Sequence, residues 1–129
     1  MSAKNSNTTS DYIEWDAAIN LIHKLYRDGD YRMSLLVGCG VFFGTRISDT
    51  LQLTWAMLLD DDRFELIEKK TKKRREIKIH NVFQKHIKDC FKTLKITDKS
   101  EYCFISRKNT VFSTQRINVL LKQMKRSMD

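Results

Sequence analysis

A basic run between Glu68 and Ile79 is the densest group of residues that could do chemistry. Seven lysines and arginines stand there against two glutamates, which gives the run a net charge of +5 out of the chain's +8. On a two-stranded ribbon, such side chains would project from a stiff support into a DNA groove or along a phosphate backbone. The alternative is a solvated hairpin tip whose lysines discourage edge pairing. The residues that we expect to contact DNA are Lys69, Lys72, Lys73, Arg74 and Arg75.

Arg46 is a second candidate, because it follows a long apolar segment and stands outside the basic run. We expect an arginine at this place to lie near the core, where it needs an anion. One possible partner is Asp49, three residues later on the same short helix. The other is a substrate phosphate, which the planar guanidinium can hold through two parallel hydrogen bonds. Residue types alone leave both possibilities open.

The segment from Gly44 to Trp55 resembles the first signature box of the tyrosine recombinases, the phage integrase-like enzymes. That box has the form Gly-x-Arg-Ile-Ser-Glu/Asp, followed by two leucines and a tryptophan. In this chain the box reads Gly44-Thr45-Arg46-Ile47-Ser48-Asp49, with Leu51, Leu53 and Trp55. The later Lys70-Thr71-x-Lys73 is similar to the family's second element, a hairpin lysine. The similarity runs from about Asp11 to Met128.

The resemblance implies roles for individual residues. Arg46 would contact the scissile phosphate and stabilise the charge that develops as it becomes five-coordinate. Lys70 would be the general acid toward the leaving deoxyribose oxygen, with Lys69 and Lys72 as close alternatives. Asp49 would order the arginine and its turn. The implied partner is double-stranded DNA, the implied process is DNA integration or another site-specific recombination in a mobile genetic element, and no metal or other cofactor is implied.

The family's remaining catalytic groups are not identifiable. They are a His-x-x-Arg box, a further His or Trp, and a tyrosine that attacks phosphorus and becomes covalently linked to DNA. The third residue after each histidine is Tyr26, Phe83 or Asp89, and all four tyrosines precede the expected place of the box. We therefore expect a truncated catalytic domain that is inactive alone. Its partners would be the missing carboxy-terminal half and, through an uncovered last helix, a second copy. The alternative is a non-catalytic basic DNA-binding or accessory protein.

Periodic apolar residues predict the helices that would position these groups. One helix runs from Trp15 to Tyr26 and stops near Gly29, and a second, nearly all apolar, runs from Tyr31 to Phe43. Gly38 and Gly40 weaken the second helix, unless a neighbouring element approaches closely there. Three more helices are predicted: Arg46 to Leu53 with Thr45 as its cap, Val82 to Leu94 with His86 packed on its apolar face, and Ser113 or Thr114 to Met128.

A small sheet is predicted in the middle of the chain. Met57 to Leu59, Phe64 to Ile67 and Arg75 to Ile79 are the apolar or β-favouring stretches around an acidic turn and the basic run. We expect them to form a three-stranded antiparallel sheet with the basic run at a hairpin tip. The fold class is then α+β and mainly α-helical. The resemblance implies the catalytic-domain fold of DNA breaking-rejoining enzymes, truncated.

The bulk composition fits one globular domain of 129 residues, with 41% hydrophobic and 31% charged residues. We expect residues 1–10 to be a flexible lead and residues 11–129 to be the partial catalytic domain. A secretory signal and an apolar run long enough for a membrane span are both missing, so a cytoplasmic location is expected. The positive charge favours nucleic acid, although an anionic membrane surface would also attract it. The three widely spaced cysteines are predicted to be reduced core residues: Cys39, Cys90 and Cys103.

Overall fold

The computed structural model describes residues 15–105 and residue 122. Two helices joined by a tight turn begin this part of the chain. α1 (Trp15–Arg27) is followed by a turn at Gly29, whose φ of 88° suits a residue without a side chain. α2 (Tyr31–Phe43) begins at once. Both helices and the stop at Gly29 confirm the sequence prediction. The last predicted helix, from Ser113 or Thr114 to Met128, lies outside the described residues.

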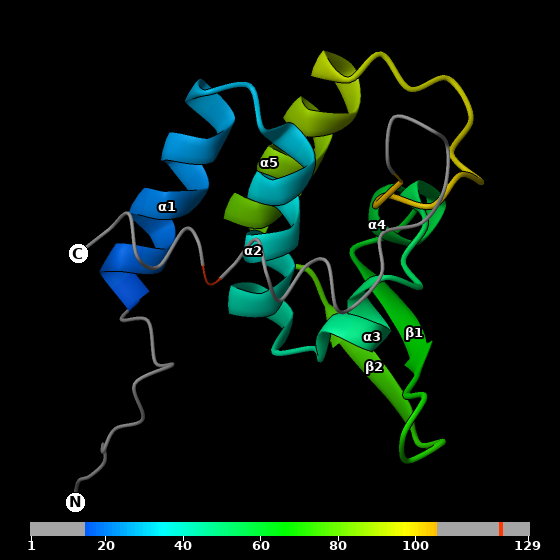
Figure 1. Cartoon of the computed structure of the whole chain (residues 1–129). Coiled ribbons are helices and arrows are strands. Elements are labelled where there is room, and N and C mark those ends of the chain that lie inside the picture. The colour runs from blue at the N-terminus through cyan, green and yellow to red at the C-terminus, as the bar shows by residue number, and fades with distance from the viewer. Residues whose placement is uncertain (1–14, 106–121, 123–129) are drawn as a thin grey trace, which may run out of the picture.

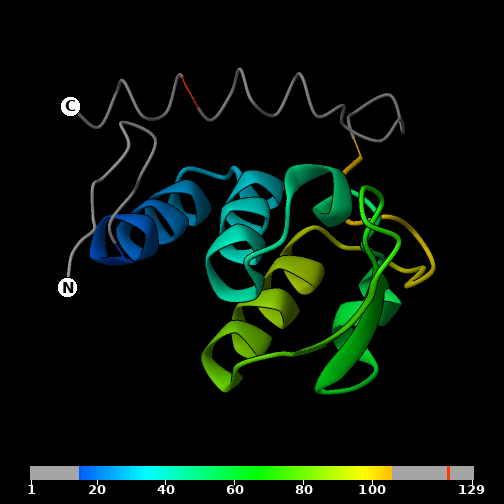
Figure 2. The ribbon, with the colours of Figure 1, turned by 90° about the horizontal axis from the view of Figure 1, so that it is seen from below.

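α2 is the central helix, and it packs against both α1 and α5 (Asn81–Thr93) (Figure 1; Figure 2). The closest approach is at Gly38, where an added Cβ would overlap the ring of Phe83 on α5. The close neighbour predicted for a glycine in this helix is therefore confirmed at Gly38. At Gly40 the prediction is wrong for the described part of the chain, because a Cβ there would have no described atom within 4 Å.

The chain turns sharply after α2. Gly44 adopts φ 64° and donates its N–H to the carbonyl of Gly40 at 3.1 Å, which ends the helix. α3 (Ile47–Thr50) follows and is shorter than the helix predicted over Arg46 to Leu53. Its N-cap residue is Arg46 rather than Thr45, because the Thr45 hydroxyl is 2.6 Å from the Thr50 hydroxyl and caps no backbone N–H.

The predicted third strand is wrong, because Met57 to Leu59 belong to the helix α4 (Trp55–Leu59). Thr54 starts this helix by accepting a hydrogen bond from the N–H of Met57 at 3.3 Å. Trp55 and Leu58 are then buried on one helical face. The sheet in the described part of the chain has two antiparallel strands, β1 (Arg63–Ile67) and β2 (Arg74–Lys78).

The inner face of the hairpin joins the helices in one core. Phe64 pairs with Ile77 in the β1–β2 register, and both side chains are buried, as is Ile79 just beyond β2. Phe83 and Ile87 of α5 pack into the same core. Their arrangement confirms a mainly helical fold with a small antiparallel hairpin. Within residues 15–105, no helix is long and apolar enough to cross a membrane.

The three cysteines are fully buried and unpaired, which confirms their predicted place in the core. Burial raises the pKa of the Cys90 thiol to about 12 and raises those of Cys39 and Cys103 well above the usual range. His86 is half-buried beside Cys90, with Nε2 2.9 Å from the Ser34 hydroxyl, and its pKa is lowered by burial. Its contacts are those of the packing residue that we predicted.

Candidate phosphate-binding site

Arg46 lies at the turn between α2 and α3, with extended backbone angles and an exposed side chain. Its carbonyl accepts from the N–H groups of Asp49 and Thr50, which fixes the backbone of the turn. Within the described residues, the guanidinium forms no ion pair, and the possible partnership with Asp49 is not formed. Arg46 is therefore exposed rather than near the core as expected, and no described residue accepts a hydrogen bond from its guanidinium.

Asp49 turns the other way and is almost completely buried, with 1% of its surface exposed. Its Oδ1 accepts from the backbone N–H of Lys69 at 2.9 Å and from Nε2 of Gln52 at 3.2 Å. Gln52 also donates to the carbonyl of Ile67 at 3.3 Å. The box that contains Arg46 is thus hydrogen-bonded directly to the end of β1 and to the turn that follows it.

The hairpin turn from Glu68 to Lys73 has an ordered backbone. Glu68 N–H donates to the carbonyl of Lys73, and Lys72 N–H donates to the carbonyl of Glu68, both at 2.9 Å. The Thr71 hydroxyl donates to Oε1 of Glu68 at 2.6 Å. The lysine side chains project outward from this support, and none of them forms an ion pair within the described residues: Lys69, Lys70, Lys72 and Lys73.

The two arginines of the predicted DNA-binding set differ from these lysines. Arg74 is exposed and forms an ion pair across the hairpin with Glu65, at 3.0 Å. Arg75 is half-buried, and it donates to Oε2 of Glu68 at 3.4 Å and to the carbonyl of Phe43 at 3.1 Å. Arg75 contacts protein groups on two elements and has less freedom to reach a ligand.

Electrostatics link the turn of Arg46 to the lysine turn. The pKa of the Glu68 carboxyl is lowered, chiefly by the hydrogen bond from Thr71 and also by the positive charges of Arg75 and Arg46. Glu68 is therefore a carboxylate at neutral pH, and it lies within the field of the Arg46 guanidinium. The carboxylate therefore offsets part of the positive charge of the two arginines at the base of the lysine turn.

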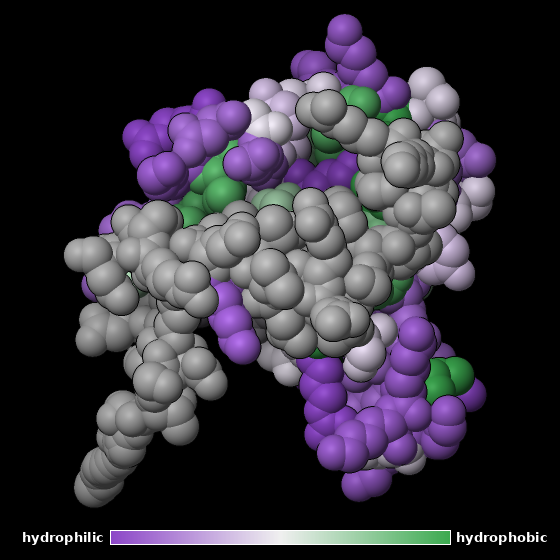
Figure 3. Space-filling model, viewed as in Figure 1, coloured by the Kyte–Doolittle hydropathy of each residue, from purple (hydrophilic) through white to green (hydrophobic). Residues whose placement is uncertain are grey.

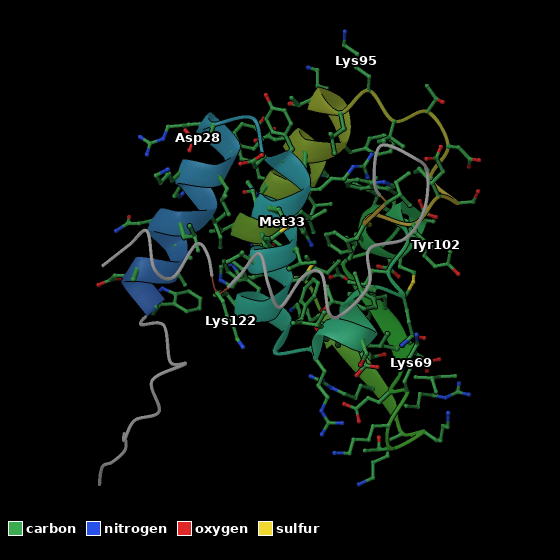
Figure 4. The ribbon with its side chains drawn as sticks, in the orientation of Figure 1. Asp28, Met33, Lys69, Lys95, Tyr102 and Lys122 are labelled. Carbon is green, nitrogen blue, oxygen red and sulfur yellow. The ribbon has the colours of Figure 1, made fainter. Side chains whose placement is uncertain are left out.

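α3 and the hairpin turn lie side by side in both ribbon views, at one end of the molecule (Figure 1; Figure 2). The hairpin surface is strongly hydrophilic (Figure 3). Lys69 lies where the hairpin meets α3, and further basic side chains extend beyond it (Figure 4). Arg46, Arg74 and the four lysines of the turn are thus exposed cations on neighbouring elements at this end of the molecule. Such a surface suits a polyanion with several phosphates.

Sequence reasoning did not find three residues that build this site. They are Gln52, Glu68 and Thr71, which fasten the lysine turn to itself and to the box of Arg46. Gln52 lies three residues after Asp49, a spacing at which two side chains on a helical turn can meet. This spacing could have indicated the contact from the sequence. Within the described residues, no cluster of three or more His, Cys, Asp or Glu side chains could hold a metal ion.

Known proteins give the family of this chain. The sequence profile of the phage integrase family matches residues 7–129, so the chain belongs to that family. A search of curated proteins found no match. Among solved structures, the fold is similar to the crystal structure of XerA recombinase, with a TM-score of 0.69 and 19% sequence identity. The similarity covers 89% of this chain but only 41% of the XerA chain, so this chain spans about two fifths of that structure's length.

Proposed function

We propose that this chain binds duplex DNA and supplies part of the catalytic site for site-specific recombination, as in the integration of a mobile DNA element. The observation that carries the proposal is the hydrogen bond from Lys69 N–H to the buried carboxylate of Asp49. This bond holds the lysine turn against the turn of Arg46, so that one phosphate backbone can be contacted from both. Membership in the phage integrase family supports the same conclusion.

In the proposed reaction, Arg46 binds the scissile phosphate. Its guanidinium donates to the non-bridging oxygens, and the bonds strengthen as negative charge accumulates on them in the five-coordinate transition state. Because Arg46 is exposed and forms no ion pair in the described part of the chain, its donors need not be released from another anion first. Asp49 supports the turn but does not touch DNA.

Lys70 is the proposed general acid. It would protonate the deoxyribose oxygen as the phosphorus–oxygen bond breaks, which avoids expulsion of an alkoxide. Lys69 and Lys72 are exposed on the same turn and are the alternatives. The attacking tyrosine and the His-x-x-Arg box would come from residues outside Met1 to Asp129, and the chain alone would bind DNA without cutting it.

DNA binding is tested first on the chain as it stands. For duplex DNA, each neutralised phosphate adds about 0.9 to the slope of log affinity against log salt concentration, so we expect a steep slope. Arg46→Ala should weaken binding, whereas Lys24→Ala, which removes one charge from α1, should not. Incubation with a nicked suicide substrate should give no covalent adduct. An adduct would overturn the proposal that the nucleophile lies elsewhere.

The catalytic assignments are tested in a protein that joins this chain to the missing half. Arg46→Ala and Lys70→Ala should each reduce cleavage by orders of magnitude. A substrate with sulfur in place of the leaving oxygen needs no proton, so it should restore cleavage by the Lys70 variant but not by the Arg46 variant. If the sulfur substrate rescues Lys69→Ala or Lys72→Ala instead, the acid is that lysine. If no joined protein cleaves DNA, the accessory function replaces the catalytic one.

A further inference from the structure

Arg75 is the only arginine of the described hairpin whose guanidinium contacts a helix. Nη2 donates to the carbonyl of Phe43, the last residue of α2, and Nη1 faces Oε2 of Glu68. Phe43 stands three residues before Arg46, and Glu68 stands two before Lys70. One guanidinium therefore bridges the chain segments that lead into the two proposed catalytic residues.

We propose that Arg75 is a positioning residue that sets the place of the lysine turn relative to Arg46. This inference rests on the proposed function, and it removes Arg75 from the residues that bind DNA directly. Arg75 acts through two protein groups, a helix carbonyl and a carboxylate, and its charge is already engaged before DNA arrives.

The chemistry of the two contacts explains why an arginine stands there. The carbonyl of Phe43 is one of the last four of α2, which have no partner inside the helix. A cation at this end also interacts favourably with the helix dipole. Arginine has several donors in a rigid fork, so it can hold a carbonyl and a carboxylate at once. A lysine ammonium is a single centre and could not span both acceptors in the same way.

Arg75 adds a restraint that the contacts at the end of β1 do not give. The N–H of Lys69 donates to Asp49 and Gln52 donates to the carbonyl of Ile67, so both bonds hold the hairpin from the β1 side. Arg75 adds a contact from the neighbouring strand to the end of α2. Contacts from both strands therefore restrain the orientation of the turn as well as its distance from Arg46. Orientation matters because a misplacement of about 1 Å can cost a catalytic group about a hundredfold in rate.

Arg74 provides the matched control. It is the neighbouring residue on β2, it carries the same charge, and its side chain is 66% exposed, against 37% for Arg75. Its partner, Glu65, lies on the other strand of the same hairpin. Replacing Arg74 therefore removes a charge from the hairpin without cutting a link to α2.

The first experiment measures the affinity of the full chain for a short duplex over a range of salt concentrations. We compare the wild type with Arg75→Met, Arg74→Met and Lys73→Met. We expect Arg75→Met to weaken binding about equally at every salt concentration, whereas Lys73→Met should reduce the salt slope by about 0.9. A reduced slope for Arg75→Met would identify Arg75 as a phosphate ligand and overturn the proposal. An unchanged affinity would overturn it as well.

A double-mutant cycle adds a readout that a general loss of stability does not move. Arg46→Ala should reduce affinity by about tenfold or more in the wild-type background, as expected for hydrogen bonds to a charged group. In the Arg75→Met background, Arg46→Ala should reduce the affinity by clearly less, because the lysine turn and the turn of Arg46 no longer act together. Additive effects would refute the coupling. If Arg75→Met does not fold, Arg75→Lys keeps the charge and should show the same non-additivity.

Amide hydrogen exchange separates this proposal from the proposed function, because it needs no DNA. In the free protein, the amides of Lys69 and Lys72 should exchange faster in Arg75→Met than in the wild type, and Arg74→Met should leave them unchanged. Equal exchange in both variants would overturn the positioning role. If the wild type shows no salt-dependent DNA binding, the proposed function fails, while the exchange result still decides whether Arg75 couples the two turns.

Discussion

Two glycines of α2 differ in their surroundings, and substitutions to alanine should have opposite effects on stability. At Gly38 an added methyl group would overlap Cε1 of Phe83 and lie 2.8 Å from its Cζ. The Phe83 ring cannot swing away easily, because it stacks on Phe42 at 4.7 Å and meets Phe43 edge-on at 5.3 Å. At Gly40 the methyl group would meet no atom of residues 15–105 within 4 Å.

The magnitudes follow from these surroundings. Alanine gains about 1 kcal/mol over glycine inside a helix, and overpacking a core costs about 1–3 kcal/mol. We therefore expect Gly40→Ala to raise the free energy of unfolding by about 0.5–1 kcal/mol, and Gly38→Ala to lower it by up to about 2 kcal/mol, which is the overpacking cost less the alanine gain. Urea unfolding followed by circular dichroism measures both changes.

A rescue variant tests the cause. Phe83→Leu shortens the side chain that the new methyl group would meet, so it should cost less in the Gly38→Ala background than alone. The reasoning fails if Gly38→Ala is as stable as Gly40→Ala. Phe43 and Gly44 form the end of α2 that leads to Arg46. Gly38→Ala should therefore also weaken DNA binding, by an amount that depends on how far it shifts α2.

Three further predictions concern the buried carboxylate, the acid limit and the thiols. Asp49→Ala should lower the free energy of unfolding by about 1–3 kcal/mol, because it leaves the N–H of Lys69 without a partner, whereas Asp49→Asn keeps an acceptor and should be closer to wild type in urea unfolding. The lowered pKa of Glu68 means that its stabilisation is present above the usual carboxyl range and is lost as the pH falls through the folded-state pKa. Urea unfolding at pH 7 and pH 3 should therefore show a smaller acid loss for Glu68→Gln, and an equal loss would contradict this role. The three thiols should resist a thiol reagent at pH 8 in the folded chain and react after unfolding, since burial raises the pKa of each.

The long helices could be predicted from the sequence because their apolar residues are the ones that are buried in the structure. α1, α2 and α5 lie within about one residue of their expected bounds. α1 and α5 have the helical period of apolar residues, and α2 is a long apolar run between turn signals. Met57 to Leu59 is too short to show a period, and its structure is decided by the hydroxyl of Thr54 and the burial of Trp55. The third predicted strand failed for that reason.

The sequence could predict which residues form the candidate site, but not which groups each of them contacts. Arg46 and the lysine turn stood out by charge and by motif. The partner of Asp49 is a backbone N–H twenty residues away, and one partner of Arg75 is the carbonyl of Phe43, thirty-two residues away. Main-chain groups are alike in every sequence, so such contacts leave no pattern to read. Arg75 therefore looked like one more member of a basic run.

The hydrogen bond between Asp49 and the backbone of residue 69 determines which substitutions are compatible with the fold at position 69. Asp49 accepts from the main chain, so any residue other than proline at position 69 can donate the same bond. The side chain at 69 is exposed and is not required for the contact. Substitution there would change the side chain that is offered to the proposed DNA ligand, while the hydrogen bond that joins the two turns would remain.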